Sequence, residues 1–184
     1  MSHQNLLMLL SHAALAGTGI YCLLQVKNEN MFCPHISFGI ITINNIIGMC
    51  WCLSSYDNRI YDIFRFTSYC QSLFALPGIT TSVWLANGYP KEWSWAWIIT
   101  PIFPLVCYLT DAEMDMPLVD LLILFNLVGL GVVSFVKNLS YGVGATIAFA
   151  LSHCYITHTT LYNYGLCFYS YFALRCLGFG QDIF

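Results

Sequence analysis

Three ionisable side chains lie in or beside apolar segments, where they could take part in chemistry: Asp57, Asp120 and His153. Carboxyl and imidazole groups are the usual general acids and bases of enzymes. A polar group inside a membrane is costly, so it usually faces the protein interior and is a default functional candidate. We therefore treat these three as hypothetical catalytic residues, and we expect Asp120 and His153 to face the interior.

Asp120 and His153 each have a structural interpretation as well. Asp120 follows Pro117 by three residues, which places it near the start of a helix. There the helix macrodipole stabilises a carboxylate, and water can reach it. His153 can be a neutral, buried imidazole that hydrogen-bonds to a neighbouring side chain. The sequence leaves both interpretations open.

A second group of polar side chains lies in the middle of two apolar segments. Asn44 and Asn45 are in one segment, and Ser68, Gln71 and Ser72 are in the next. Such residues commonly form hydrogen bonds between neighbouring helices in a membrane. They can instead line a polar cavity. For each residue taken singly, we expect an interhelical hydrogen bond.

The sequence contains no motif for a metal ion or a cofactor, and we predict neither. His153 and His158 are about 140° apart round a helix, so they do not form the same-face pair of a zinc site. The acidic segment 111–115 lacks the length and the glycine of a calcium-binding loop. The nine cysteines include no C-x-x-C pair, and most lie in apolar segments, where a free thiol packs as a small hydrophobic group.

The composition indicates the solvent in which these residues must be positioned. Of the 184 residues, 58% are hydrophobic and only 8% are charged, whereas a soluble domain carries about 25% charged residues. The mean hydropathy is +0.68. A soluble enzyme and a disordered chain are therefore excluded, and the net charge of −3 provides no basic surface for nucleic acid. We predict a polytopic membrane protein whose first partner is the lipid bilayer.

The apolar residues fall into seven segments, and a helix needs about 17–25 such residues to cross the hydrocarbon core. The segments are 6–26, 36–53, 63–86, 93–109, 117–136, 141–156 and 161–177. The polar breaks between them are short, so consecutive helices should be antiparallel neighbours. We predict an all-α transmembrane bundle of about seven spans that forms one domain, residues 1–184.

The basic residues give the orientation of this bundle. Four of them fall on one face (Lys27, Lys91, Lys137 and Arg175), and two, Arg59 and Arg65, fall on the face that carries the N-terminus. Because basic residues are enriched on the cytoplasmic side, we expect the N-terminus to be non-cytoplasmic and the C-terminus to be cytoplasmic.

The last three apolar segments resemble a known family. Residues 139–153 (LSYGVGATIAFALSH) are similar to the penultimate helix of the lysoplasmalogenase family, which has a G-A-x-L-F-x-x-S-D-like pattern. Residues 164–175 (YGLCFYSYFALR) are similar to the final helix of that family, which has a Y-x-x-A-x-x-L pattern. The resemblance implies an eight-span helical bundle of the endoplasmic reticulum or of a bacterial membrane. For this chain we expect the endoplasmic reticulum or another endomembrane rather than the plasma membrane. The resemblance also implies hydrolysis of the vinyl ether bond of lysoplasmalogens.

This chain departs from the family pattern at the residues that matter for the reaction. His153 stands where the family has an aspartate, and Asp57 is the nearest match to a G-D pair in an earlier helix. One N-terminal span of the family also has no counterpart. Vinyl ether hydrolysis requires a positioned acid that protonates the enol ether carbon. We therefore expect weak or no lysoplasmalogenase activity.

Three functions follow as hypotheses. The leading one is a small multi-pass membrane protein with a lysoplasmalogenase-like bundle and no clear catalytic constellation. The second is a membrane lipid hydrolase that uses Asp57, Asp120 and His153, which must then share one pocket. The third is a partner subunit or transporter-like protein, in which these side chains are scattered. The expected partners besides the bilayer are a lysophospholipid or another membrane protein.

Overall fold

The computed structural model describes residues 3–26, 32–54, 57–110, 116–156 and 158–179. These residues form eight helices and no strand, which confirms the all-helical fold class. The helices are α1 (His3–Gln25), α2 (Phe32–Leu53), α3 (Asn58–Ala86), α4 (Lys91–Ile99), α5 (Ile102–Leu109), α6 (Met116–Val136), α7 (Ser140–Cys154) and α8 (Thr159–Cys176).

Six of the seven apolar segments correspond to single helices whose ends differ from the expected ones by a few residues. The segment 93–109, which we expected to be one helix, is instead two short helices, α4 and α5. Pro101 lies between them; proline has no N–H to donate, and its ring crowds the preceding turn. The expectation of one continuous helix is therefore wrong for this segment.

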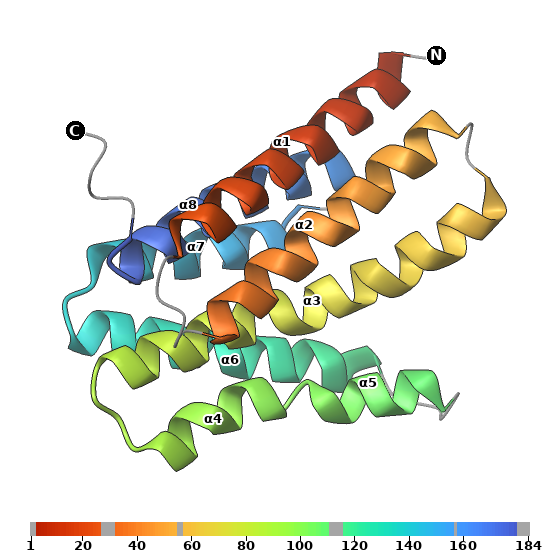
Figure 1. Ribbon diagram of the computed structural model, residues 1–184. Helices are drawn as coiled ribbons and strands as arrows, with labels where there is room; N and C mark the ends of the chain where they lie inside the picture. The colour runs from red at the N-terminus through yellow and green to blue at the C-terminus, as the bar shows by residue number, and fades with distance from the viewer. Residues whose placement is uncertain (1–2, 27–31, 55–56, 111–115, 157, 180–184) are drawn as a thin grey trace, which may run out of the picture.

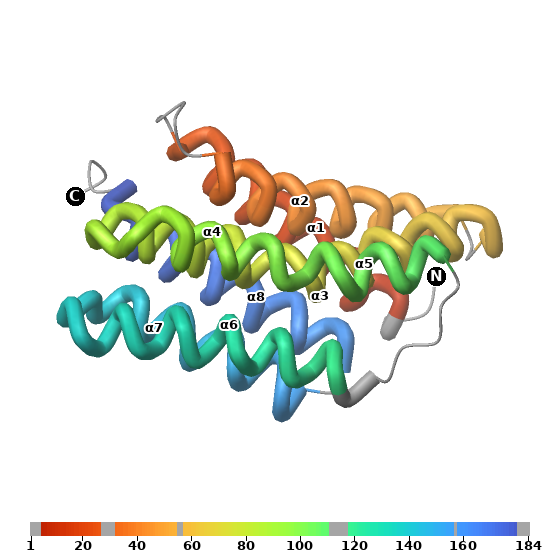
Figure 2. Tube along the Cα trace, turned by 90° about the horizontal axis from the view of Figure 1, so that it is seen from below, coloured from red at the N-terminus to blue at the C-terminus, as the bar shows by residue number. Residues whose placement is uncertain are grey.

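Six helices pack in a closed ring in the order α1, α2, α3, α6, α7 and α8, with α8 returning to α1. α4 packs against α3, and α5 continues in line with α4 (Figure 1). Figure 2 shows that the helices run along a common axis. α6 packs chiefly against α3 and α7 rather than against α5, its predecessor in the chain. We predicted that consecutive helices would be antiparallel neighbours, because the connections are short. This prediction is wrong for α5 and α6.

The ring is filled by large apolar side chains, and each of its helices contributes at least one that is almost completely buried. They are Leu15, Phe38, Ile79, Leu130, Phe149 and Tyr169. The rings of Phe149 and Tyr169 meet edge to face, with centroids 4.9 Å apart. This contact joins α7 to α8 in the interior.

Pro77 lies inside α3 and removes one hydrogen bond of this helix, the one to Leu73 O, because proline lacks an N–H. The next two carbonyl groups of the same turn, those of Phe74 and Ala75, accept hydrogen bonds from neighbouring helices. Side chains from two neighbouring helices approach this turn: Ser37 Oγ donates to Phe74 O at 3.0 Å, and the Tyr169 hydroxyl donates to Ala75 O at 2.8 Å. These bonds fix α2 and α8 against α3.

The mid-helix amides form hydrogen bonds between helices, as expected for residues of their type. Asn44 Nδ2 and Asn45 Nδ2 both donate to Gln71 Oε1, at 2.9 and 3.0 Å. Thr67 and Ser68 donate to Asn44 Oδ1 at 2.8 and 3.0 Å. Asn44, Asn45 and Gln71 are all buried. The interhelical interpretation is thus confirmed for these three and for Ser68, whereas the Ser72 hydroxyl donates within its own helix, to Tyr69 O.

Three helices, α1, α2 and α6, are long and apolar enough to cross a membrane. After Asp120, the outer face of α6 is apolar, with exposed side chains at Leu121, Phe125, Val128, Val132 and Phe135. A continuous exposed apolar face on this scale marks contact with a membrane or a partner rather than with water. The three helices and this face indicate a membrane protein.

Candidate functional site

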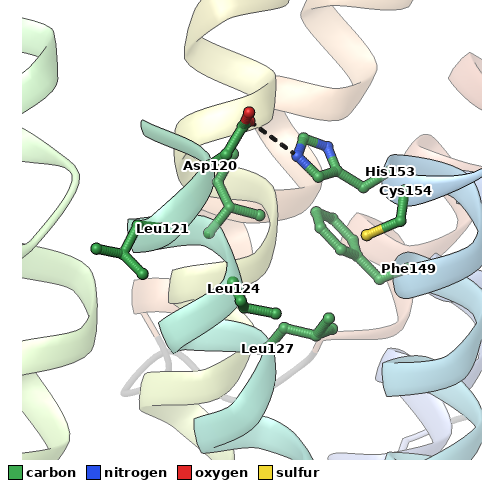
Figure 3. A pocket seen from close by; sticks show the side chains of 8 residues that line it. Asp120, Leu121, Leu124, Leu127, Phe149, His153 and Cys154 are labelled. Carbon is green, nitrogen blue, oxygen red and sulfur yellow. Dashed lines mark ion pairs between the residues drawn. The ribbon is translucent and has the colours of Figure 1, made fainter. Parts of the chain in front are cut away.

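Asp120 and His153 come together where α6 begins and α7 ends. The two helices pack side by side and are joined by a short connection at their other ends, so the start of α6 lies beside the end of α7. His153 Nε2 is 3.5 Å from Asp120 Oδ1, which is an ion pair when the imidazole is protonated (Figure 3). Two of the three hypothetical catalytic residues therefore share one site.

The pair stands at one end of a groove of about 640 Å³ between α6 and α7. Leu124 and Leu127 form part of the α6 wall of the groove, Leu121 lies at its outer edge, and Phe149 forms part of the α7 wall (Figure 3). The Phe149 ring stacks on the His153 ring with centroids 6.0 Å apart. The groove thus combines one polar end with an apolar body.

The two partners differ in exposure. The Asp120 side chain is 71% exposed, and the His153 side chain is 25% exposed. The expectation that Asp120 faces the interior is therefore wrong, and the carboxylate near a helix start that water can reach is the better description. His153 is partly buried and contacts Asp120. An exposed pair of this kind contributes only about 0–1 kcal/mol to stability.

Asp57 is not part of this site. It is the N-cap of α3, where its Oδ1 accepts a hydrogen bond from the backbone N–H of Arg59 at 2.7 Å. It does not line the groove that contains Asp120 and His153. A cap of this kind satisfies a backbone donor that the helix leaves unpaired. The structure therefore does not unite the three residues that the hydrolase hypothesis requires.

Among the described residues, no group of three or more His, Cys, Asp or Glu side chains is placed to hold a metal ion. The acidic segment 111–115 lies outside the described residues. All nine cysteines are free thiols; Cys22, Cys33 and Cys52 are buried, and Cys50 and Cys154 are exposed. Cys154 lies beside His153 in the wall of the groove (Figure 3).

A second polar site contains residues that our sequence reasoning did not single out, His12 and Asn163. His12 Nδ1 is 2.8 Å from Asn45 Oδ1, and Asn163 Nδ2 donates to Ser11 Oγ at 3.1 Å. Both residues lie inside apolar segments that we expected to be helices. The same criterion that selected Asn44 and Gln71, a polar residue within an apolar segment, could have found them.

No family model, no curated protein and no solved structure matches this chain. The lysoplasmalogenase resemblance accordingly has no support beyond the two segments that carry it.

Proposed function

We propose that this chain is a seven-span membrane protein, with a non-cytoplasmic N-terminus, that binds a zwitterionic lysophospholipid in the groove between α6 and α7. An endomembrane, such as the endoplasmic reticulum, is the proposed location. The observation that supports the binding role most directly is the Asp120–His153 pair at the end of an apolar groove.

The membrane spans of this proposal count α4 and α5 as one interrupted span. A proline-broken segment is tolerated at membrane depth where neighbouring helices cover the freed backbone. Such cover is present here, because α4 packs against α3 and the Thr100 hydroxyl donates at 2.8 Å to Trp97 O, the carbonyl that Pro101 leaves without its helical partner. The exposed apolar face of α6 would then contact lipid.

The charge pair complements a zwitterionic head group. The Asp120 carboxylate attracts the ammonium group of choline or ethanolamine, and a protonated His153 attracts the phosphate. Because Asp120 is largely exposed, a head group can approach it without displacing protein atoms. A single acyl chain would then lie along Leu121, Leu124 and Leu127, and the groove volume is within the usual range for ligand sites, about 300–1,000 Å³.

Binding without hydrolysis is the function that this geometry favours. One observation supports the hydrolase as a second candidate: His153 has a carboxylate partner at 3.5 Å, as a histidine acid or base would need. The exposure of Asp120 and the separate place of Asp57 favour the binding role.

The test uses photoreactive lysophosphatidylcholine and the full chain in lipid nanodiscs. We expect saturable crosslinking at the α6–α7 groove, which Leu124→Trp abolishes by filling the groove. Val128→Trp is the matched control, because Val128 is an exposed residue one turn further along α6 that does not line the groove. Equal crosslinking in the two variants would contradict a site between α6 and α7.

A further inference from the structure

A second cavity, apart from the α6–α7 groove, lies among the helices of the ring and opens to the outside near Thr159, an exposed residue at the start of α8. Its volume is about 360 Å³, and seven of its nine lining residues are polar. The lining comes from α1, α2, α3, α8 and the connection before α8. His12, Asn44, Gln71 and Asn163 in this lining are each at most 3% exposed. So many buried amide and imidazole groups round one space are unusual, because each costs free energy unless it is hydrogen-bonded.

The hydrogen bonds of this network determine which atom of Asn45 faces His12. Asn45 Nδ2 donates to Ile41 O at 2.7 Å and to Gln71 Oε1 at 3.0 Å, so this nitrogen uses both of its hydrogens. The oxygen of Asn45 must then be the atom that lies 2.8 Å from His12 Nδ1. An oxygen that close to a ring nitrogen accepts a hydrogen, so Nδ1 carries the hydrogen of the neutral imidazole.

The tautomer leaves His12 Nε2 with a lone pair. This atom is buried and has no hydrogen-bond partner among the described residues. Asn163 Nδ2 also lies 3.2 Å from Nδ1, but an Nδ1 that carries a hydrogen cannot accept from it, and Asn163 Nδ2 donates to Ser11 Oγ instead. The imidazole ring packs closely against α2 at Gly48. There is no room for a side chain at this position, since an added Cβ would lie only 2.7 Å from His12 Cε1. His12 is therefore a fixed, buried acceptor in the cavity lining.

The opposite kind of group, a hydroxyl donor, is supplied by Tyr162. Tyr162 lines the same cavity as His12 and Gln71. Its hydroxyl can donate one hydrogen to a ligand. Thr159 adds a further hydroxyl to the lining.

The cavity lining excludes charged ligands. None of its residues is Asp, Glu, Lys or Arg, and a buried charge is strongly disfavoured without an opposite partner. A metal ion is disfavoured as well, because the described residues contain no cluster of metal-binding side chains. The complementary ligand is uncharged, donates a hydrogen to His12 and accepts one from Tyr162. A hydroxyl group does both.

We infer that this cavity binds the hydroxyl groups of an uncharged polyol, with His12 Nε2 as the acceptor and the Tyr162 hydroxyl as a donor. The volume is at the lower end of the range for ligand sites, about 300–1,000 Å³, which suits a small molecule or a head group. This chemistry is shared by a free polyol and by the glycerol head of a neutral lipid. Ile156, which also lines the apolar groove between α7 and α8, is where an acyl chain would leave the cavity.

The test is nuclear magnetic resonance of the full chain in nanodiscs, with ¹⁵N-labelled histidine and His12→Gln to assign the signal. Without ligand, we expect the Nδ1–H tautomer at His12. Added glycerol, or 1-monoacylglycerol in the disc, should shift the Nε2 resonance saturably. Tyr162→Phe should weaken this binding about tenfold, the usual effect of losing one hydrogen bond. Tyr164→Phe, an exposed position on the same helix, should leave it unchanged.

The two probes separate the possible sources of the polyol. Tighter binding of monoacylglycerol identifies a neutral lipid, and equal or tighter binding of glycerol identifies a free polyol. A cavity that holds only water would give no saturable shift with either probe, which overturns the inference. Equal binding to the Tyr162→Phe variant, or binding of glycerol 3-phosphate as tight as that of glycerol, overturns it as well.

Discussion

Asn45 Oδ1 accepts a hydrogen bond from His12 Nδ1 at 2.8 Å, and the same amide donates to Gln71. One side chain of α2 therefore joins α1 to α3. Both of its partners are at most 3% exposed. Removing it leaves the buried His12 Nδ1 without its acceptor, whereas Gln71 Oε1 keeps the bond from Asn44. An unsatisfied buried polar group costs more than the bond itself contributes.

The first prediction concerns the stability that this amide provides. Asn45→Ala should lower the free energy of unfolding by about 1–3 kcal/mol, the cost of leaving buried polar groups unsatisfied. Ile46→Ala is the control, because Ile46 is the next residue and its side chain is 45% exposed. Unfolding of both variants in mixed micelles with increasing SDS measures the difference. Equal losses of stability would show that Asn45 has no special structural role.

The second prediction concerns the backbone beside Pro77. Tyr169→Phe removes only the hydroxyl that donates to Ala75 O, in the turn whose hydrogen bonds the proline interrupts. We expect a loss of about 0.6–1.7 kcal/mol, the range measured for interhelical hydrogen bonds in membrane proteins. Tyr164→Phe is the matched control on the same helix, because Tyr164 is 39% exposed. The same SDS titration measures the stability of both variants. If Tyr169→Phe left the free energy of unfolding unchanged, the bond to Ala75 O would not contribute to stability.

The third prediction concerns the ion pair. Asp120→Asn should change the free energy of unfolding by less than about 1 kcal/mol, because the Asp120 carboxylate is mostly exposed. It should nevertheless weaken crosslinking of photoreactive lysophosphatidylcholine, because the variant has no charge to attract the ammonium group. A large loss of stability with unchanged crosslinking would assign the pair to the fold instead.

The helices were predictable from the sequence because each depends on a local property, the length of an apolar segment between polar breaks. The break at Pro101 was predictable in principle too, since proline interrupts a helix wherever it falls in the interior. What the sequence could not give is which helices meet. The packing of α6 against α3 rather than α5, and of α8 against α1, depends on contacts between residues far apart in the chain.

In the candidate sites, too, the types of residue were predictable from the sequence, whereas the contacts between them were not. Asp120 and His153 could be selected by type and position, but their contact at 3.5 Å follows from the side-by-side packing of α6 and α7. The sequence left two interpretations of Asp120 open, an interior side chain and a carboxylate that water can reach, because the choice depends on which face of α6 turns outward. For the second cavity, all four of Asn44, Gln71, His12 and Asn163 could be selected as polar residues within apolar segments, but their meeting round one space depends on the packing of α1 and α8 in the ring.

The fourth prediction concerns topology. Seven spans place the two termini on opposite sides of the membrane, and the four-to-two distribution of basic residues puts the N-terminus on the non-cytoplasmic side. In sealed microsomes, a tag at the N-terminus should resist added protease and a tag at the C-terminus should be digested. Two tags on the same side would contradict an odd number of spans. A digested N-terminal tag and a protected C-terminal tag would reverse the orientation.

The last prediction is that the chain has weak or no lysoplasmalogenase activity. Protonation of a vinyl ether at neutral pH needs an acid that is held in a water-poor pocket and aimed at the enol ether carbon. Here the carboxylate beside His153 is 71% exposed, and Asp57 caps a different helix. The pair therefore lacks the enclosure that would keep a proton available.

Purified chain in detergent, given a lysoplasmalogen and assayed for released aldehyde, tests this directly. A lysoplasmalogenase measured in the same detergent is the positive control. We expect aldehyde release no faster than in the His153→Ala and Asp120→Asn variants. Robust aldehyde release by the unchanged chain that is lost in both variants would contradict this prediction. It would show that the reaction needs both His153 and Asp120, and the α6–α7 groove would then be an active site.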